Sequence, residues 1–272
     1  MEVTFHGVRG STPVSGAEFR RTGGHTSCVA LRPDDSAETL VLDAGTGIQR
    51  LGASLAGAAF HGTILLTHLH WDHVQGLPFF APADRPDACT VLGQPAQGRD
   101  PEALLAEVMS PPHFPITPAG LEGTWRHRAL EPGEHRFGAF AVLALEVPHK
   151  GGRAFGYRVE TGGASIAYVP DHAPTAFGPG PDGLGELHTA ALELACDVDV
   201  LVHGAPFTAA EIERAHAFGH ATAEYAASLA RAAGARDLIV THHAPGRADE
   251  QVDAIAASIG ATPAREGLVV RC

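Results

Sequence analysis

The segment Thr67–His73 places four potential metal ligands within six positions: His68, His70, Asp72 and His73. The run before it, Thr63–Thr67, is apolar and β-branched, which predicts a buried strand. Alternate residues of a strand share one face, so His68 and His70 should leave the sheet on the same side. If a helix begins directly afterwards, Asp72 and His73 lie on a different face. The four residues then suit two adjacent divalent ions of the zinc, manganese or iron type.

A site for two ions needs further ligands, and three residues follow other predicted strands. His149, Asp171 and His242 each come after an apolar stretch and stand within three positions of a glycine or proline. A histidine at a strand end is, taken alone, commonly a polar loop residue. Together with the first four residues, however, the three complete a set of seven ligands. Within that set the carboxylate of Asp171 can bridge both ions.

Composition restricts the class of protein. With 272 residues and 44% apolar content, the chain can bury a large core. It has neither an apolar run long enough to span a membrane nor the basic and apolar start of a secretory signal. The cysteines lack metal-knuckle spacing and fit reduced thiols in the cytoplasm. They are Cys28, Cys89, Cys196 and Cys272. The net charge of −12 disfavours extended nucleic-acid binding, so we expect a small anionic substrate.

Short strands are predicted in both halves of the chain, with helices between some of them. The expected strands are Glu2–His6, Ser27–Leu31, Thr39–Leu42, Thr63–Leu66, Cys89–Leu92, Phe140–Glu146, Ala154–Glu160, Ser165–Val169, Val198–Val202, Leu238–Thr241 and Gly267–Arg271. The expected helices are Gly47–Ala56, Pro101–Met109, Gly185–Ala195, Ala221–Ala233 and Ala248–Ile259. Ser110–Gly123 contains four prolines and is expected to be irregular. No linker divides the chain, which predicts a single domain over residues 1–272.

These pieces resemble the metallo-β-lactamase superfamily over nearly the whole chain. The matching segments are Leu42–Gly47, Thr67–His73 with Gly76, His149, Tyr168–Asp171 and Val240–His242. The resemblance implies an α/β (α+β) fold, an αββα sandwich of two mixed sheets with the metals at one edge. It further implies that His68, His70 and His149 hold one ion. Asp72, His73 and His242 would hold the other, and Asp171 would bridge them.

Within this superfamily, the chain resembles the branch of tRNA 3′-processing endonucleases and small cyclic phosphodiesterases. The segments that carry this resemblance are Gly7–Pro13, Gly23–Cys28, Gly219–Thr222 and His242–Pro245 with Asp249. Two residues depart from the pattern of that branch: His25 replaces the usual asparagine, and Gly204 replaces the glutamate of the endonucleases. No long basic arm for holding tRNA is evident. These departures favour a compact phosphodiesterase.

Roles in catalysis follow from the chemistry. Asp72 can orient the nucleophile, and His220 is the candidate proton donor to the leaving group because imidazole titrates near neutral pH. The alternative for His220 is a polar residue at the start of a helix, without a catalytic task. Asp43 is expected to position a ligating histidine from behind.

Several other residues near these motifs have weaker signals. Arg9, Arg20, Arg21 and His25 are candidates for contacts with phosphate, although surface arginines are common. Trp71, between two expected ligands, is predicted to be a packing residue and not a platform on which a base stacks.

The sequence therefore predicts a hydrolase with two divalent ions, zinc being expected and manganese or iron the alternatives. The leading substrate is a small or cyclic nucleotide-like phosphodiester. The alternatives are an ester, lactone, thioester or β-lactam, a tRNA precursor cleaved at its 3′ side, and a metal-stabilised protein without catalysis. A homodimer is compatible with the sequence.

Overall fold

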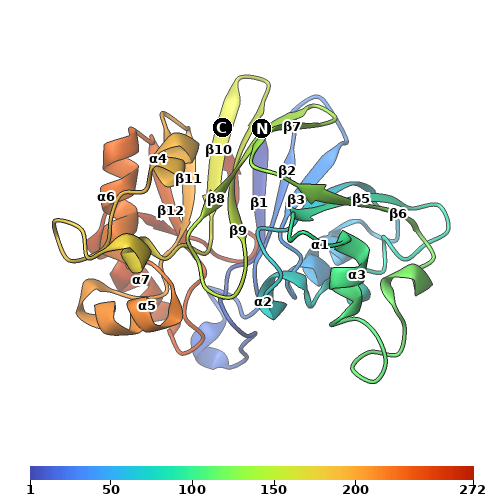
Figure 1. Cartoon of the computed structure of the whole chain (residues 1–272), viewed down its shortest axis with the longest axis horizontal. Helices are drawn as coiled ribbons and strands as arrows, with labels where there is room; N and C mark the ends of the chain where they lie inside the picture. Colours follow the sequence, from blue (N-terminus) through green and yellow to red (C-terminus); the bar gives the residue numbers. More distant parts are fainter.

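Two mixed sheets pack face to face in the structure, a computed structural model that describes all 272 residues (Figure 1). The seven strands of the first sheet are, in spatial order, β14 (Val269–Arg271), β1 (Glu2–Gly7), β2 (Cys28–Arg32), β3 (Thr39–Leu42), β4 (His61–Leu65), β5 (Cys89–Pro95) and β6 (Thr124–Leu130). Those of the second are β13 (Thr262–Pro263), β12 (Asp237–Thr241), β11 (Val200–Gly204), β10 (Ala164–Val169), β9 (Ala154–Thr161), β8 (Phe140–Val147) and β7 (Gly133–Phe137). Strands β3 to β6 run parallel, as do β10 to β13.

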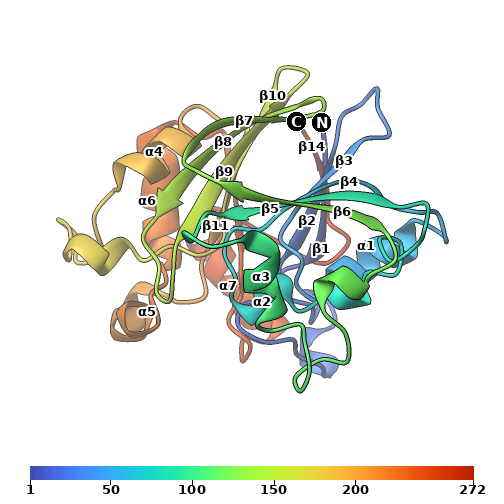
Figure 2. The same cartoon turned by 45° about the vertical axis from the view of Figure 1, so that its right-hand side comes forward.

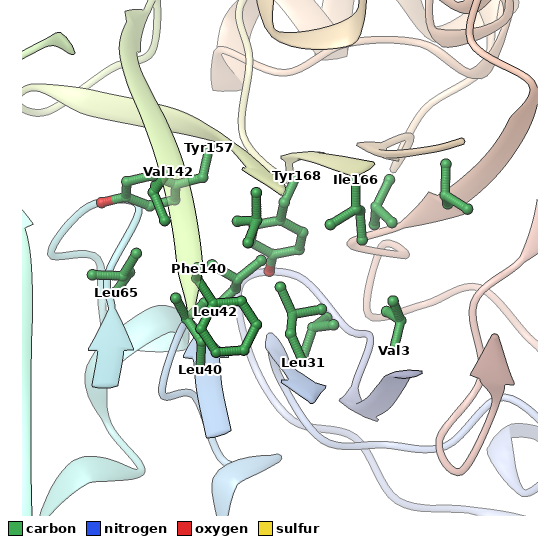
Figure 3. Packing of buried hydrophobic residues seen from close by; sticks show 14 of the residues in the cluster. Val3, Leu31, Leu40, Leu42, Leu65, Phe140, Val142, Tyr157, Ile166 and Tyr168 are labelled. Atoms are coloured by element: carbon green, nitrogen blue, oxygen red, sulfur yellow. The ribbon is translucent and has the colours of Figure 1, made fainter. Parts of the chain in front are cut away.

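Apolar side chains from both sheets fill the space between them (Figure 3). Leu40 and Leu42 of the first sheet face Phe140 and Val142 of the second in this layer. All six residues of β10 are buried, because the strand is covered on both faces. This double burial explains why its sequence reads as an apolar run without alternation.

Helices cover the outer faces, which completes the predicted αββα sandwich (Figures 1 and 2). On the first sheet lie α1 (Ile48–Ser54), α2 (Trp71–Val74) and α3 (Pro101–Ala106). Against the second lie α4 (Thr189–Ala195), α6 (Ala223–Ala233) and α7 (Asp249–Ser258), and α5 (Ile212–Phe218) precedes α6. Short 3-10 turns span Ala17–Phe19, Leu77–Phe79, Pro118–Gly120, Pro174–Phe177 and Ala209–Glu211.

Apart from the short 3-10 turns, four of the observed elements were not predicted: β6, β7, the two-residue strand β13 and α5. The strands β6 and β7 lie at the edges of the two sheets and carry exposed charged residues, so neither has the apolar alternation that marks a strand. Helix α5 is short and contains two charged residues and a histidine in seven positions. The predicted helices begin or end up to four residues from the observed ones, and Ser110–Gly123 is irregular apart from one short turn, as expected.

The two ends of the chain lie together, since β1 pairs with β14 in the first sheet (Figures 1 and 2). The amino group of Met1 donates a hydrogen bond of 2.9 Å to the carbonyl of Cys272. None of the helices has both the length and the apolar character that crossing a bilayer requires.

Candidate metal centre

The structure brings all seven predicted ligands to one edge of the sandwich. They follow four strands: β4 leads to His68, His70, Asp72 and His73, β8 to His149, β10 to Asp171 and β12 to His242. Helix α2 begins directly after His70, so Asp72 and His73 turn onto a different face from the first two histidines, as the sequence predicts. The positions of the side chains therefore follow from where strands end and one short helix starts.

One group of three histidines forms the first half of the centre. The ring centroid of His68 lies 4.3 Å from that of His70 and 4.9 Å from that of His149. Nε2 of His149 is 3.3 Å from Nδ1 of His70. Each of the three offers a nitrogen within 4.8 Å of the others, which is close enough to surround one ion. Burial lowers the pKa of all three, that of His149 to about 4, so that neutral imidazoles face the centre at pH 7.

A second group joins a carboxylate to two imidazoles. Oδ2 of Asp72 lies 3.1 Å from Nε2 of His242 and 3.3 Å from Nε2 of His73. Burial alone would raise the pKa of Asp72, but the facing His73 and His242 lower it. Burial likewise opposes charge on His73, yet the facing carboxylates, that of Asp72 first, raise its pKa well above the usual value. A region that favours a proton on a buried imidazole so strongly would also favour a cation.

Asp171 lies between the two groups. Its Oδ2 is 2.9 Å from Nε2 of His73 and 3.2 Å from Nε2 of His242, in the second group. Its Oδ1 is 3.7 Å from Nε2 of His149, in the first. A carboxylate in this place can contact both ions, which is the geometry that a bridging ligand requires.

Divalent cations fit this set of side chains. Nε2 of His68 is buried without a hydrogen-bond partner, and Nε2 of His73 and Oδ2 of Asp171 lie 2.9 Å apart without a satisfied hydrogen bond. A buried polar atom without a partner costs free energy, and metal coordination removes that cost. Imidazole nitrogens and carboxylate oxygens are also the donors that zinc takes. The assignment of the seven residues as ligands stays a prediction, which this geometry supports.

Residues behind the centre hold the ligands in place. The buried carboxylate of Asp43 lies 2.7 Å from Nδ1 of His73 and accepts hydrogen bonds from Thr67 and from the hydroxyl of Tyr168, so it contacts a predicted metal ligand as expected. A Cβ at Gly45 would lie 2.2 Å from the carbonyl oxygen of Asp72. Glycine is therefore required there for the close approach of this turn to helix α2.

His220 lies closer to the centre than its sequence position suggested. Its Nδ1 is 3.1 Å from Oδ1 of Asp171, and with His149 and Asp171 it forms a further group that could hold an ion. His220 lies two residues before the N-cap of the following helix and does not cap it, and its catalytic role stays a prediction. Helix α6 begins at Ala223, and the hydroxyl of Thr222 caps it by accepting from the N–H of Tyr225.

The adjacent histidines at the end of β12, His242 and His243, point to different sides. His242 has a φ of 55° and turns toward Asp72 and Asp171. His243 is buried on the other side, with Nε2 3.0 Å from the carbonyl oxygen of Ala264. His243 therefore faces a neighbouring loop and not the two groups of ligands.

Two expectations about nearby residues are wrong. Trp71 does not pack in the interior, because 71% of its surface is exposed at the start of α2. Arg9 does not present its guanidinium to a ligand, because it is fully buried and donates to the carbonyl oxygens of Gly23 and Arg247.

Of the other candidates for phosphate contacts, only Arg21 has its guanidinium in ion pairs. Arg21 forms ion pairs with Glu250 and Asp253. The backbone N–H of His25 donates to Glu266. Arg20 is exposed.

A cavity of about 550 Å³ opens onto the centre. Its floor includes His70, His149, His220 and His242, and its wall includes Phe207, Arg214 and Phe218. The sequence analysis missed these wall residues, because they lie on and beside the unpredicted helix α5. Only a correct prediction of that helix could have placed them.

The sequence profile of the beta-lactamase superfamily domain matches residues 38–243, which include all seven residues of the centre. The chain belongs to this superfamily. It is accordingly a metal-dependent hydrolase with the metallo-β-lactamase fold, as the sequence predicts, and the fold implies divalent metal ions.

Relatives with curated names match most of the chain. It is 27% identical over 277 residues to ribonuclease Z of Haloferax volcanii, and the match covers 83% of each protein. It is 28% identical over 289 residues to ribonuclease BN of Cronobacter sakazakii, covering 89% of this chain and 88% of the relative.

Solved structures show the same fold over the full chain. The short form of human tRNase Z has a TM-score of 0.69 at 22% identity, covering 100% of this chain and 99% of the other. A diphosphatase from the PhnP family has a TM-score of 0.73 at 16% identity, covering 100% and 97%.

Proposed function

We propose that this protein is a phosphodiesterase of the ribonuclease Z type, which uses two divalent ions, zinc first, to cleave tRNA precursors on their 3′ side. One observation carries the proposal: Asp171 lies between a group of three histidines and a group formed by Asp72, His73 and His242. The relatives named ribonuclease Z support the choice of substrate. The cytoplasm, predicted from the cysteines, is the expected compartment.

The side chains of the centre have distinct tasks in this reaction. Bound ions would lower the pKa of a water molecule and neutralise charge on the phosphate oxygens. Asp72 accepts a hydrogen bond of 2.6 Å from the N–H of Ser11, which fixes the carboxylate that orients the nucleophile. His220 lines the cavity and is held near Asp171 by its Nδ1. We assign to its imidazole the proton that the leaving oxygen takes up.

A tRNA precursor with a 3′ extension tests the proposal directly. Metal-loaded protein should release the extension, and the variant His68→Ala should not, whereas His135→Ala, on the edge strand β7, should cleave like the wild type. Nitrocefin and a simple lactone serve as the competing substrates. Hydrolysis of either of these in place of the RNA would refute the proposal.

A second candidate is a phosphodiesterase for a small or cyclic nucleotide, and Gly204 favours it. A Cβ at this position would lie 1.8 Å from the carbonyl oxygen of Pro170, so the glutamate of the resembling endonucleases cannot be accommodated without a shift of the backbone. The net charge of −12 also gives little attraction for a long polyanion. The ratio of kcat/KM for the tRNA precursor and for 2′,3′-cyclic AMP decides between the two candidates.

A further inference from the structure

The cavity over the metal centre has an aromatic and cationic wall to which the proposed hydrolysis assigns no task. Phe207 and Phe218 stand nearly parallel there, with ring centroids 6.3 Å apart and planes inclined by 14°. The guanidinium carbon of Arg214 lies 5.3 Å from the centre of the Phe207 ring. All three residues line the same cavity as His149, His220 and His242.

The two rings differ in exposure. Phe207 is buried, whereas 59% of the surface of Phe218 is exposed, although the cost of exposing a large apolar ring is considerable. Phe207 thus backs Phe218 from the inside, and Phe218 presents its ring to the cavity. A flat apolar ligand that covered it would remove this cost.

Hydrogen bonds fix this wall relative to the centre. The carbonyl oxygen of Gly219, next to Phe218, lies 2.8 Å from Nδ1 of His149 and accepts its hydrogen bond. On the other side, Nζ of Lys150 donates to the carbonyl oxygen of Ala217 at 2.6 Å. The aromatic ring is therefore held between two contacts with the segment that carries a predicted metal ligand.

The charge of the wall is positive. Arg214 and Arg247 both line the cavity, and the one carboxylate in contact with them is that of Glu211, which pairs with Arg247 and lies 3.5 Å from Nη1 of Arg214. One positive charge is left over beside the aromatic pair. A volume of about 550 Å³ is within the range of small-molecule sites and can contain a nucleotide.

We propose that this wall binds the nucleobase of the nucleotide whose phosphate lies at the metal centre, with the base stacked on Phe218. The proposal rests on the proposed function, because it takes the ligand to be a nucleotide. Every base has an aromatic face, so the stack gives affinity without strong base preference. Arg214 supplies the positive charge that the sugar-phosphate backbone attracts.

Binding of thymidine 5′-monophosphate and of methyl phosphate to the metal-loaded protein tests the proposal, since only the first ligand carries a base. We expect Phe218→Ala to weaken binding of thymidine 5′-monophosphate by about 5- to 100-fold, the effect of losing one base stack. Methyl phosphate should bind unchanged. Phe218→Trp should retain the affinity for the nucleotide.

The control is Phe79→Ala, because Phe79 is 58% exposed and lines a different groove beside Trp71. It should leave both affinities as they are. The base site is refuted if the wild type binds the nucleotide no better than methyl phosphate, or if Phe218→Ala weakens the binding of both ligands equally. It is also refuted if Phe79→Ala weakens nucleotide binding as much as Phe218→Ala does. Protein that shows the expected binding but cleaves no phosphodiester would refute the proposed function and leave the base site standing.

Discussion

Two clusters of buried histidines lie at the same end of this molecule, and they differ in one respect that separates a reactive site from a structural one. In the metal centre, imidazoles face the carboxylates of Asp72 and Asp171, and several nitrogens have no partner. In the second cluster, His172, His188 and His203 face one another without a carboxylate.

The histidines of the second cluster bond one another, and within it only Nε2 of His188 has no hydrogen-bond partner. Nδ1 of His203 donates to the carbonyl oxygen of Gly204, which leaves its Nε2 to accept from Nδ1 of His172 at 3.3 Å. Nε2 of His172 then accepts from Nδ1 of His188 at 2.8 Å. Burial lowers the pKa of all three, that of His203 to about 4, so this chain of neutral rings is consistent at pH 7. Both clusters contain a buried nitrogen without a partner, so histidine content and unpaired nitrogens alone do not predict a metal site. The carboxylates that face the imidazoles of the first cluster distinguish it from the second.

The largest effect is expected when the bridging carboxylate is removed. Asp171→Ala should reduce the metal content from about two ions per chain, as a two-metal site requires. It should lower turnover by more than the 10–100-fold that loss of a residue behind a metal ligand costs. Elemental analysis and phosphodiester turnover measure the two effects. If this variant retained two ions, Asp171 would not be a metal ligand, and the facing carboxylates would not distinguish the two clusters.

A substitution of His220 tests whether this residue is a proton donor or a metal ligand. We expect His220→Ala to retain its metal and to lose about 10²–10⁴ in turnover, the usual range for a general acid. Substrates with a nitrophenol leaving group need little protonation and should lose much less. His220 lies 3.1 Å from Asp171, which is close enough for it to be a metal ligand instead. Loss of one ion in His220→Ala would show that it is one.

Local patterns explain how much of the centre could be predicted from the sequence. His68 to His73 follow a buried strand directly, and one change from strand to helix determines their faces. His149, Asp171 and His242 follow strands that meet at one edge, which only the fold resemblance could place together. The roles of Arg9 and Trp71 depend on contacts with distant segments, so neither burial nor exposure could be predicted from neighbouring residues.

In the fold, too, local patterns predict some elements, whereas others depend on contacts with distant segments. Strand β10 was predicted because both of its faces are covered by apolar layers. The edge strands β6 and β7 are stabilised by pairing along one side while solvent reaches the charged residues, so their sequences do not alternate. The cluster of His172, His188 and His203 joins residues from three separate segments, and no spacing along the chain indicates it.

A substitution in the second cluster should lower the stability of the protein and leave its metal content unchanged. His172→Leu leaves Nε2 of His203 and Nδ1 of His188 buried without partners, which should lower the free energy of unfolding by about 2–4 kcal/mol. Urea denaturation measures the loss, and elemental analysis should still find the full metal content. A variant that keeps its stability but loses an ion would show that the two clusters act as one site.

The smallest expected effect concerns His6, a buried histidine outside both clusters. Burial, then the positive charges of Arg50 and Arg32, lower its pKa from 6.5 to about 4. The unfolded chain therefore binds more protons than the folded one between these values, so His6 costs stability as the pH falls through this range. Between pH 6.5 and 5.5 the free energy of unfolding should fall by about 1 kcal/mol more in the wild type than in His6→Gln. Denaturation of both proteins at each pH gives the difference. Equal slopes would mean that His6 is protonated as easily in the folded protein as in water, and that burial without a partner does not keep a histidine neutral here.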